Sequence, residues 1–183
     1  MERNTNRLID LSNQQLDFRQ TEIRGFSLNY IQANISELLE ETYLNFKPLA
    51  EQKDLDLQRE LPPAHVMAFV DVEAFTKILT NLFNNAVKYA AGNVAVYLPP
   101  VDKNRNCFTI EVKNDGYLVP YEMKEKIFEP FFRLKETEKQ KGTGIGLALS
   151  RSLAEWHNGV LDIKEPENGL NVYMTIPVNH EDF

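Results

Sequence analysis

The sequence predicts an α/β fold: a two-layer sandwich with a mixed sheet of about five strands under about three helices. Long segments with apolar residues at helical spacing are interspersed with short runs typical of strands. The chain has 183 residues, of which 43% are hydrophobic, enough for one main domain with a substantial core. Helices are expected over residues 1–20, 31–49, 71–91 and 147–156. Strand candidates are residues 26–28, 55–57, 65–70, 94–98, 107–112, 160–163 and 170–176.

The first 50 residues have the pattern of two amphipathic helices. Leucines form an apolar stripe along residues 1–20, with polar residues outside it. Residues 26–28 are a candidate short strand between the two helices. The second helix, over residues 31–49, is expected to kink or end near Lys47, because Pro48 lacks a backbone N–H and clashes with the preceding turn.

The third helix follows two strand candidates, residues 55–57 and 65–70, which a Pro-Pro turn separates. Asp71 and Glu73 stand at its start, where acidic side chains interact favourably with the helix dipole. Gly92 follows the last turn and is expected to form the C-cap.

The C-terminal half contains four strand candidates and one helix. Residues 94–98 and 107–112 are expected to form a hairpin, because a polar turn joins them. After the helix over residues 147–156, the runs 160–163 and 170–176 form a second pair of strands joined by a polar turn.

Composition argues against several classes of protein. The formal net charge of −7 makes a general nucleic-acid-binding surface unexpected. A single cysteine, Cys107, excludes an internal disulfide and a cluster of thiolate metal ligands. No apolar run approaches the ~20 residues that cross a membrane, and the polar first residues do not have the pattern of a secretory signal.

Polar side chains interrupt the third helix in the run Asn81-Leu82-Phe83-Asn84-Asn85-Ala86-Val87-Lys88-Tyr89. Asn81, Asn85 and Lys88 are spaced i, i+4 and i+7, within roughly a 60° arc beside the apolar stripe. Asparagine is unfavourable in mid-helix, because its amide competes with the backbone for hydrogen bonds. The run is therefore either a polar edge facing water or a set of amide oxygens and one ammonium group directed at an anion and its metal.

Three later stretches add candidate site residues. Asn114-Asp115-Gly116 follows a strand directly, where a glycine lets the backbone approach a ligand closely. Residues 127–133 are dense in aromatics and lead into residues 135–141, a charged segment expected to be a mobile surface loop. Gly142-Thr143-Gly144-Ile145-Gly146 opens the last helix, where such glycines allow a phosphate to approach backbone N–H groups.

The glycine-rich stretch differs from three common nucleotide-binding motifs. It lacks the Gly-Lys-Ser/Thr of the Walker motif. Its pattern is G-x-G-x-G after a charged loop, whereas a dinucleotide fingerprint is G-x-G-x-x-G after a strand. The catalytic-loop and Asp-Phe-Gly signatures of protein kinases are also missing from the sequence.

Four stretches resemble, in this order, the N box, a glycine box, the F box and a second glycine box of bacterial two-component sensor histidine kinases, the hybrid type included: N-L-F-N-N-A-V-K-Y, N-D-G-Y-L-V-P, I-F-E-P-F-F-R and G-T-G-I-G-L-A-L. The resemblance is to the family's ATP-binding module, the GHKL or Bergerat fold shared with gyrase, Hsp90 and MutL, and it covers about residues 21–178. It implies a catalytic domain over residues 21–183. Residues 1–20 resemble the C-terminal end of the second helix of the dimerisation and phosphoacceptor domain.

The resemblance implies roles for the matching residues. Asn85 would coordinate Mg²⁺ through its amide oxygen, and Asn81 would support the phosphate end one turn away. Lys88 would contact phosphate, Tyr89 would lie along the adenine, and Arg133 would belong to a lid over the γ-phosphate. The implied catalytic residues are Asn81, Lys88 and Arg133. The implied nucleotide-binding residues are Asn81, Asn85, Lys88, Tyr89, Asn114, Gly116, Leu118, Phe128, Lys141, Gly142, Thr143, Gly144, Ile145, Gly146 and Leu147.

Two positions depart from the family pattern, in which the first glycine box reads Asp-x-Gly-x-Gly and its Asp accepts a hydrogen bond from the adenine amino group. Here Asn114 replaces the Asp and Leu118 replaces the second Gly. Asn keeps an oxygen acceptor and adds an NH₂ donor, so ATP binding is expected to survive in a weakened form. Asp115 is the neighbour that could take over, but its side chain should point elsewhere if Asn114 points into the site.

The reaction implied is phosphoryl transfer to a protein histidine. GHKL relatives that hydrolyse ATP carry a glutamate one turn before the metal-binding Asn, and here that position is Asn81, which cannot act as a general base. None of the three histidines has the sequence context of the family's acceptor, so the chain is expected to bind ATP without phosphorylating itself.

Partners and location also follow from the resemblance. The expected partners are the phosphoacceptor domain of the parent kinase and a downstream response regulator receiver domain, with neither nucleic acid nor direct membrane contact. The parent would be a homodimeric, membrane-anchored receptor with this domain in the cytoplasm, and the isolated chain a monomer or weak dimer. Two alternatives stay open: a degenerate domain acting as a scaffold, which Asn114 and Leu118 favour, and a stand-alone ATPase.

Overall fold

The computed structural model describes residues 2–22, 26–101, 106–135, 140, 142–164 and 170–177, with the backbone alone for residues 2–8, 10 and 170–173. The helices are α1 (Glu2–Glu22), α2 (Ile35–Gln52), α3 (Val72–Tyr89) and α4 (Gly146–Trp156), with short 3₁₀ turns η1 (Tyr121–Met123) and η2 (Lys126–Phe128). The strands are β1 (Ile31–Asn34), β2 (Asp56–Glu60), β3 (Met67–Val70), β4 (Asn93–Tyr97), β5 (Cys107–Asn114), β6 (Val160–Ile163) and β7 (Leu170–Pro177).

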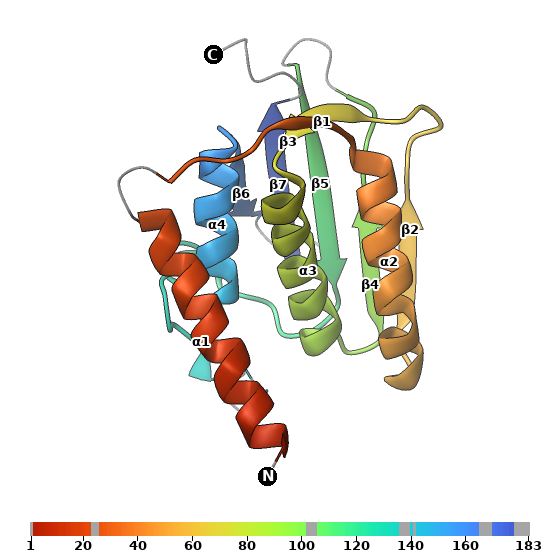
Figure 1. Ribbon diagram of the computed structural model, residues 1–183. Helices are drawn as coiled ribbons and strands as arrows, with labels where there is room; N and C mark the ends of the chain where they lie inside the picture. Colours follow the sequence, from red (N-terminus) through yellow and green to blue (C-terminus); the bar gives the residue numbers. More distant parts are fainter. Residues whose placement is uncertain are drawn as a thin grey trace.

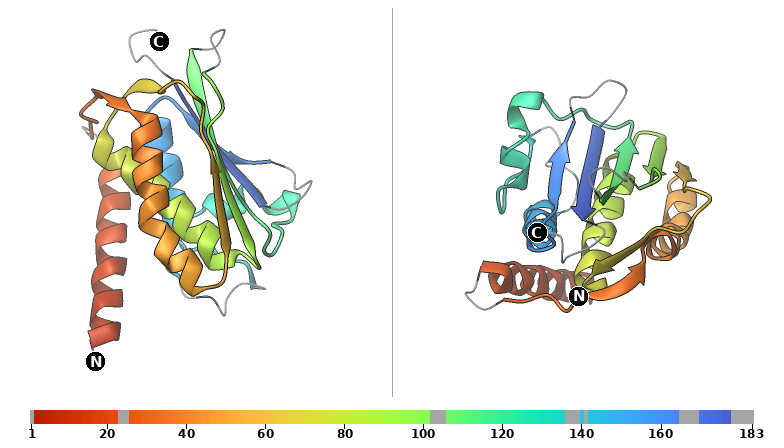
Figure 2. Two further views of the ribbon diagram at one scale, coloured as in Figure 1. Left: turned by 90° about the vertical axis from the view of Figure 1, so that its right-hand side faces the viewer. Right: turned by 90° about the horizontal axis from the view of Figure 1, so that it is seen from above.

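A five-stranded sheet in the order β2-β4-β5-β7-β6 forms one layer of the molecule. Its β2–β4 pair is parallel and its other pairs are antiparallel, so the sheet is mixed. Helices α2, α3 and α4 lie side by side on one face of this sheet, and α1 lies outside them (Figures 1 and 2). The expected two-layer α/β sandwich is confirmed, and both expected antiparallel strand pairs are present.

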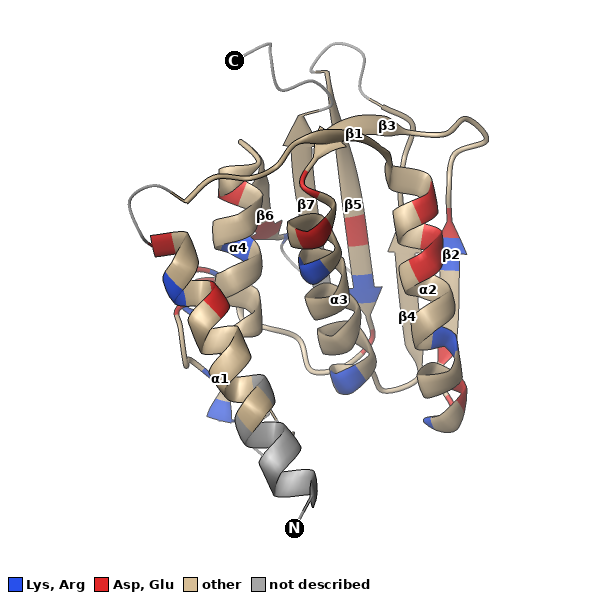
Figure 3. Ribbon diagram, viewed as in Figure 1, with Lys and Arg blue, Asp and Glu red and all other residues tan. Residues whose placement is uncertain are grey.

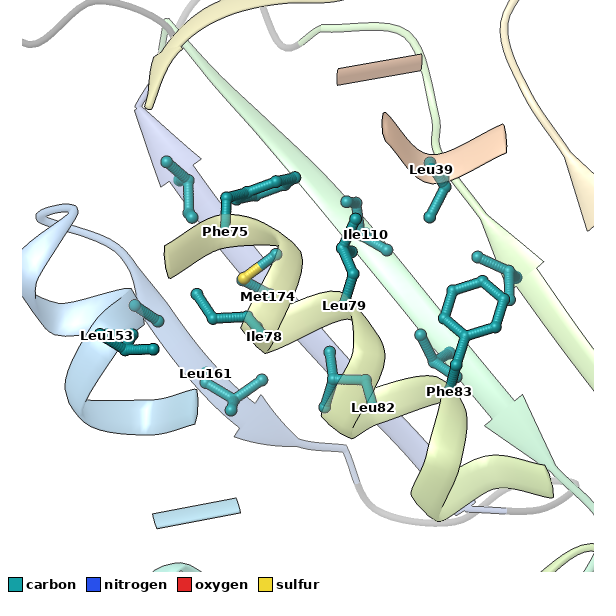
Figure 4. Close-up of a cluster of buried hydrophobic side chains, with 14 of the residues drawn as sticks. Leu39, Phe75, Ile78, Leu79, Leu82, Phe83, Ile110, Leu153, Leu161 and Met174 are labelled. Atoms are coloured by element: carbon teal, nitrogen blue, oxygen red, sulfur yellow. The ribbon is translucent and has the colours of Figure 1, made fainter. Parts of the chain in front are cut away.

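The core lies between α3 and the sheet. Phe75, Ile78, Leu79, Leu82 and Phe83 of α3 are all at most 2% exposed, and Figure 4 shows their side chains among those of the neighbouring helices and strands. Each such side chain contributes roughly 1.5–3 kcal/mol through burial. The apolar stripe of α3 is therefore fixed against the sheet, and its polar positions must face sideways.

Capping interactions set both ends of α3. The Asp71 carboxylate accepts the Ala74 N–H at its start, with an Oδ1–N distance of 2.9 Å. At the other end the backbone leaves the helix at Ala90, so the expectation that Gly92 forms the C-cap is wrong. Asp115 instead accepts the N–H groups of the residues that follow, including Gly92. Figure 3 shows acidic residues near the start of α3 and a basic residue at its end, a distribution that favours the helix dipole.

Two expectations for the N-terminal half are corrected. Residues 26–28 are not a strand; the strand is β1, which was expected to be the start of a helix. β1 pairs with β3, a partner more than 30 residues away, and Asn34 then caps α2 by accepting the Glu37 N–H. Apolar residues from Ile31 onwards recur at helical spacing, and four residues are too few to show the alternation of a strand. The sequence therefore did not reveal this strand.

Helix α2 also continues past Pro48 to Gln52, contrary to the expected end near Lys47. Pro48 removes the hydrogen bond to the carbonyl of Leu44. Both residues are exposed, so water can hydrogen-bond that carbonyl. The remaining turn is retained because Ala50, only 1% exposed, packs into the protein.

His157 joins the start of α3 to the end of α4. Its ring is 1% exposed; Nε2 accepts the Asp71 N–H at 3.1 Å, and Nδ1 lies 2.7 Å from the Leu153 carbonyl oxygen. Because a backbone N–H only donates and a carbonyl only accepts, the imidazole must be neutral with its proton on Nδ1.

None of the described helices is long and apolar enough to cross a membrane.

Candidate functional site

The second half of α3, the end of β5 and the loop before α4 converge on one region. A Cβ placed on Gly116 would lie 1.7 Å from the Tyr89 carbonyl oxygen, and one on Gly142 would lie 2.4 Å from Lys88 Nζ. A Cβ on Gly146 would lie 3.5 Å from Asn81 Oδ1. The N box and both glycine boxes therefore meet in space, with Gly116 a position where backbone contact leaves no room for a side chain.

Asn81 ties α3 to the first turn of α4. Its Nδ2 donates to the Gly146 carbonyl oxygen at 3.2 Å and to Ser150 Oγ at 3.1 Å. Ser150 is fully buried, and its hydroxyl donates to the Gly146 carbonyl oxygen at 2.8 Å. These contacts make Asn81 a positioning residue for the start of α4. Sequence reasoning missed Ser150, although it stands at i+4 from Gly146.

Asn85, Lys88 and Tyr89 line the last turns of α3. Lys88 Nζ donates to Tyr89 Oη at 2.7 Å and lies 4.4 Å from the centroid of the Tyr89 ring. The cation is thus held on the aromatic ring beside Gly142. Asn85 is half-buried, and its amide makes no hydrogen bond within the described part of the chain. Its oxygen is available to a ligand, but its predicted contact with a metal stays a prediction.

Asn114 and Asp115 make hydrogen bonds to different segments, and whether Asn114 points into a nucleotide site stays a prediction. Asn114 is 6% exposed, and its Oδ1 accepts the Gly116 N–H at 3.0 Å. Asp115 Oδ1 accepts the N–H groups of Ala91, Gly92 and Asn93, each at 2.9 Å. Its Oδ2 accepts the Asn93 side-chain amide at 2.7 Å. These bonds, led by the backbone N–H of Asn93, hold the pKa of Asp115 well below its usual range.

Leu118, at the second departure from the family pattern, is 46% exposed. Two residues before it, Gly116 packs against the end of α3, so the close approach of backbone in this box depends on Gly116. Neither the exposure nor the packing tests whether Leu118 contacts a nucleotide, which stays a prediction.

The F box is anchored on α4. Phe128 is 6% exposed, and the guanidinium carbon of Arg151 lies 4.6 Å from its ring centroid. Arg151 also pairs with Glu125 at 2.9 Å. These contacts bury the Phe128 ring in packing with α4, and a contact with ligand stays a prediction.

The segment after the F box returns to the second glycine box. Phe131 N–H donates to the Gly144 carbonyl oxygen at 2.9 Å, and Gly144 has a positive φ of 74° that favours glycine. A Cβ on Gly144 would also lie 2.8 Å from the Phe131 carbonyl carbon. Arg133 donates from its guanidinium to the Gln140 carbonyl oxygen. Of the expected charged loop, residues 136–139 and Lys141 lie outside the described residues.

The start of α4 has the features of an anion site. The N-cap residue, Ile145, is buried and its side chain makes no capping hydrogen bond, while Gly142, Thr143 and Leu147 are half-buried. The first backbone N–H groups of a helix lack intrahelical partners and favour negative charge. Thr143 Oγ1 accepts the Ile145 N–H at 3.3 Å and donates to Gln14 Oε1 of α1 at 2.7 Å. Sequence reasoning missed Gln14, because its partner is 129 residues away.

A groove of about 590 Å³ is lined by residues of α1 and α3, Asn81 among them, and by Leu149 of α4. Lys77 on this groove pairs with Asp17 at 3.2 Å and with Glu73 at 3.1 Å. Among the described residues, no cluster of three or more His, Cys, Asp or Glu side chains could hold a metal ion.

Comparisons with known proteins agree with this geometry. A family model described as histidine kinase-, DNA gyrase B- and HSP90-like ATPase matches residues 70–180. The sensor histidine kinase TmoS of Ectopseudomonas mendocina is 30% identical over 184 residues, which cover 98% of this chain and 19% of TmoS. The chain spans about a fifth of the length of the curated relatives it matches.

Two solved structures resemble the chain. The catalytic domain of histidine kinase ThkA has a TM-score of 0.74 at 28% identity, over 84% of this chain and 99% of that domain. Histidine kinase ThkA in complex with response regulator protein TrrA has a TM-score of 0.81 at 23% identity, over 100% of this chain and 50% of ThkA, a likeness of fold alone. On the match that spans most of its length, the chain belongs to the family of histidine kinase-, DNA gyrase B- and HSP90-like ATPases.

Proposed function

We propose that this chain is the ATP-binding catalytic module of a sensor histidine kinase. It binds Mg-ATP and donates the γ-phosphate to a histidine on a separate phosphoacceptor domain. The observation that carries this proposal is the convergence of Lys88, Gly116, Gly142 and the uncapped start of α4 around the last turns of α3. The similarity to TmoS and to the ThkA catalytic domain supports it.

The residues of this site suit a nucleotide triphosphate. Backbone N–H groups at the start of α4 bind phosphate oxygens, and Lys88, held on the Tyr89 ring, supplies a positive charge beside them. Gly142 leaves room for both, because a side chain there would meet the Lys88 ammonium. Asn85 fits Mg²⁺ through its amide oxygen, with phosphate oxygens as further ligands. Mg²⁺ would neutralise charge on the phosphates.

Transfer fits the site better than hydrolysis. Hydrolysis needs a carboxylate near the reacting phosphate to activate water. At that position on α3 stands Asn81, whose amide is bonded to Gly146 and Ser150. The acidic residues of α3 lie at its other end, where Asp71 caps the helix and Glu73 pairs with Lys77. Catalysis then depends on positioning and charge neutralisation.

The domain assignment and partners belong to the same proposal. Residues 21–183 are the catalytic domain, and residues 1–20 are the end of a helix from the phosphoacceptor domain. A response regulator receiver domain takes the phosphoryl group downstream. The parent protein is a homodimer anchored in a membrane, with this domain in the cytoplasm. TmoS, a sensor histidine kinase, is about five times as long as the matched region and supports a larger parent.

Calorimetric titration with a non-hydrolysable ATP analogue and Mg²⁺ tests the proposal. We expect a dissociation constant between micromolar and sub-millimolar, weakened at least tenfold by Asn85→Ala. The matched control is Asn84→Ala, since Asn84 is the exposed neighbour on α3 and its loss should change affinity less than twofold. Absence of binding to the folded wild-type chain would contradict the proposal and favour a degenerate scaffold domain.

A further inference from the structure

The amide of Asn114 has a fixed orientation. It is 6% exposed at the end of β5, and its Oδ1 accepts the Gly116 N–H at 3.0 Å. Because a backbone N–H can only donate, the oxygen of the amide must face Gly116 and the NH₂ group must face away from it. That NH₂ group makes no hydrogen bond within the described part of the chain. The nitrogen is not fully enclosed by protein, so this donor is open to a ligand.

Asp115 cannot replace the missing acceptor. Its two oxygens accept three backbone N–H groups and one side-chain amide from the turn at residues 91–93. A carboxylate with four donors around it is held towards that turn. The end of β5 therefore offers a ligand one hydrogen-bond donor from Asn114 and no carboxylate.

This donor lies away from Asn81 and the start of α4. Gly116, bonded to Asn114, contacts the backbone of Tyr89, whereas Gly146 contacts Asn81. Eight residues separate these two positions on α3, which corresponds to about 12 Å along the helix. A triphosphate at the start of α4 leaves the Asn114 end for the other end of the nucleotide, its base.

Given the proposed nucleotide site, we propose that Asn114 is a base-specificity residue, and that the site binds 6-oxopurine nucleotides such as ITP at least as tightly as ATP. Adenine presents an amino donor at position 6, while hypoxanthine and guanine present a carbonyl acceptor there. The Asn114 NH₂ group pairs with the carbonyl and faces the adenine amino group as donor against donor. If the Asn114 amide were rotated by 180°, its oxygen could accept a hydrogen bond from the adenine amino group. Its NH₂ group would then face the Gly116 N–H, donor against donor.

The test compares dissociation constants of Mg-ATP and Mg-ITP by displacement of a fluorescent nucleotide. ITP lacks the 2-amino group of GTP, so it differs from ATP only at the C6–N1 edge. We expect wild-type protein to bind ITP as tightly as ATP or more tightly. Asn114→Asp keeps an oxygen for Gly116 and presents a second as an acceptor, so it should favour ATP over ITP tenfold or more. Because both dissociation constants are measured on the same protein, their ratio does not depend on the fraction of that protein that is folded.

Asn158→Asp is the matched control. It makes the same change of charge at an exposed residue after the far end of α4, where the backbone φ of 56° also suits Asp. Its ATP-to-ITP ratio should equal that of wild type. A wild-type preference for ATP of tenfold or more, unchanged by Asn114→Asp, would overturn the base-specificity proposal and leave the proposed function standing. Failure of wild type to bind either nucleotide would instead contradict the proposed function itself.

Discussion

Asp115 accepts four hydrogen bonds from three consecutive residues, Ala91, Gly92 and Asn93. These bonds hold the turn after α3 against the end of β5, and so fix Tyr89 next to Gly116. A residue inside a sequence box expected to bind nucleotide thus has a structural task. Donors directed at the carboxylate favour its charged form, which lowers the pKa of Asp115.

Acidic pH should remove the stabilisation that the Asp115 carboxylate contributes. Because the pKa of Asp115 is lower in the folded than in the unfolded protein, its stabilisation is present above the ordinary Asp pKa, near 4, and is lost as pH falls below it. We expect Asp115→Asn to lower the free energy of unfolding at pH 7 by about 1 kcal/mol, a modest value because the turn is exposed. Urea unfolding at pH 7, 5, 4 and 3 should show this difference shrinking in acid.

The matched control for Asp115 is Asp54→Asn. Asp54 is an exposed residue with a positive φ of 57°, a conformation that Asn also adopts well. Its free energy of unfolding should stay within about 0.5 kcal/mol of wild type at pH 7. A difference between Asp115→Asn and wild type that stays constant from pH 7 to pH 3 would show that the carboxylate charge contributes nothing.

At the scale of elements, the sequence predicted the features that a regular spacing of apolar residues indicates. The apolar stripe of α3 located that helix and its polar edge, and α4 was predicted from its glycine box and the leucines that follow. The period could not reveal β1, since its four residues become a strand only through pairing with β3. It could not reveal Gln14 or Ser150 either, because each forms a hydrogen bond with a residue that is distant in the sequence.

Helix α1 contacts the second glycine box, and this contact should affect nucleotide affinity. Gln14 Oε1 accepts from Thr143, whose oxygen in turn accepts the Ile145 N–H at the start of α4. Gln14→Leu removes the acceptor and should weaken Mg-ATP binding about threefold to tenfold. Gln14→Glu keeps an oxygen acceptor and should retain affinity within about twofold. Calorimetry on both variants, with thermal unfolding to confirm folding, measures the effect.

The control for α1 is Gln20→Leu, an exposed position on the same helix. It makes the same substitution without touching the glycine box and should leave nucleotide affinity unchanged. Equal losses of affinity in Gln14→Leu and Gln20→Leu would show that α1 affects the site through general packing. In that case the hydrogen bond to Thr143 would have no specific role.

At the scale of the whole molecule, the site and two of the three histidines lie apart. The site gathers at the C-terminal end of α3 and at the start of α4, the end of the molecule towards which the N-terminus of α1 also points (Figure 1). His157 lies at the opposite end of α4 and is buried. His65 precedes β3, near the start of α3, and is exposed. The 18 residues of α3 place the two ends about 27 Å apart.

This separation predicts that the chain binds ATP without phosphorylating itself. Phosphoryl transfer requires the acceptor nitrogen within about 3–3.5 Å of the phosphorus. His65 is too far from the site, and the buried His157 has both ring nitrogens engaged.

His180 lies outside the described residues, so His180→Gln is prepared alongside wild type. Incubation with γ-labelled ATP and Mg²⁺ should leave both proteins free of acid-labile label, while a histidine-bearing phosphoacceptor domain added in trans acquires it. Label on wild-type protein that is lost in His180→Gln would identify His180 as an acceptor and contradict the prediction. Label that persists in His180→Gln would also contradict the prediction, because His65 or His157 would then be the acceptor, within one chain or between two chains.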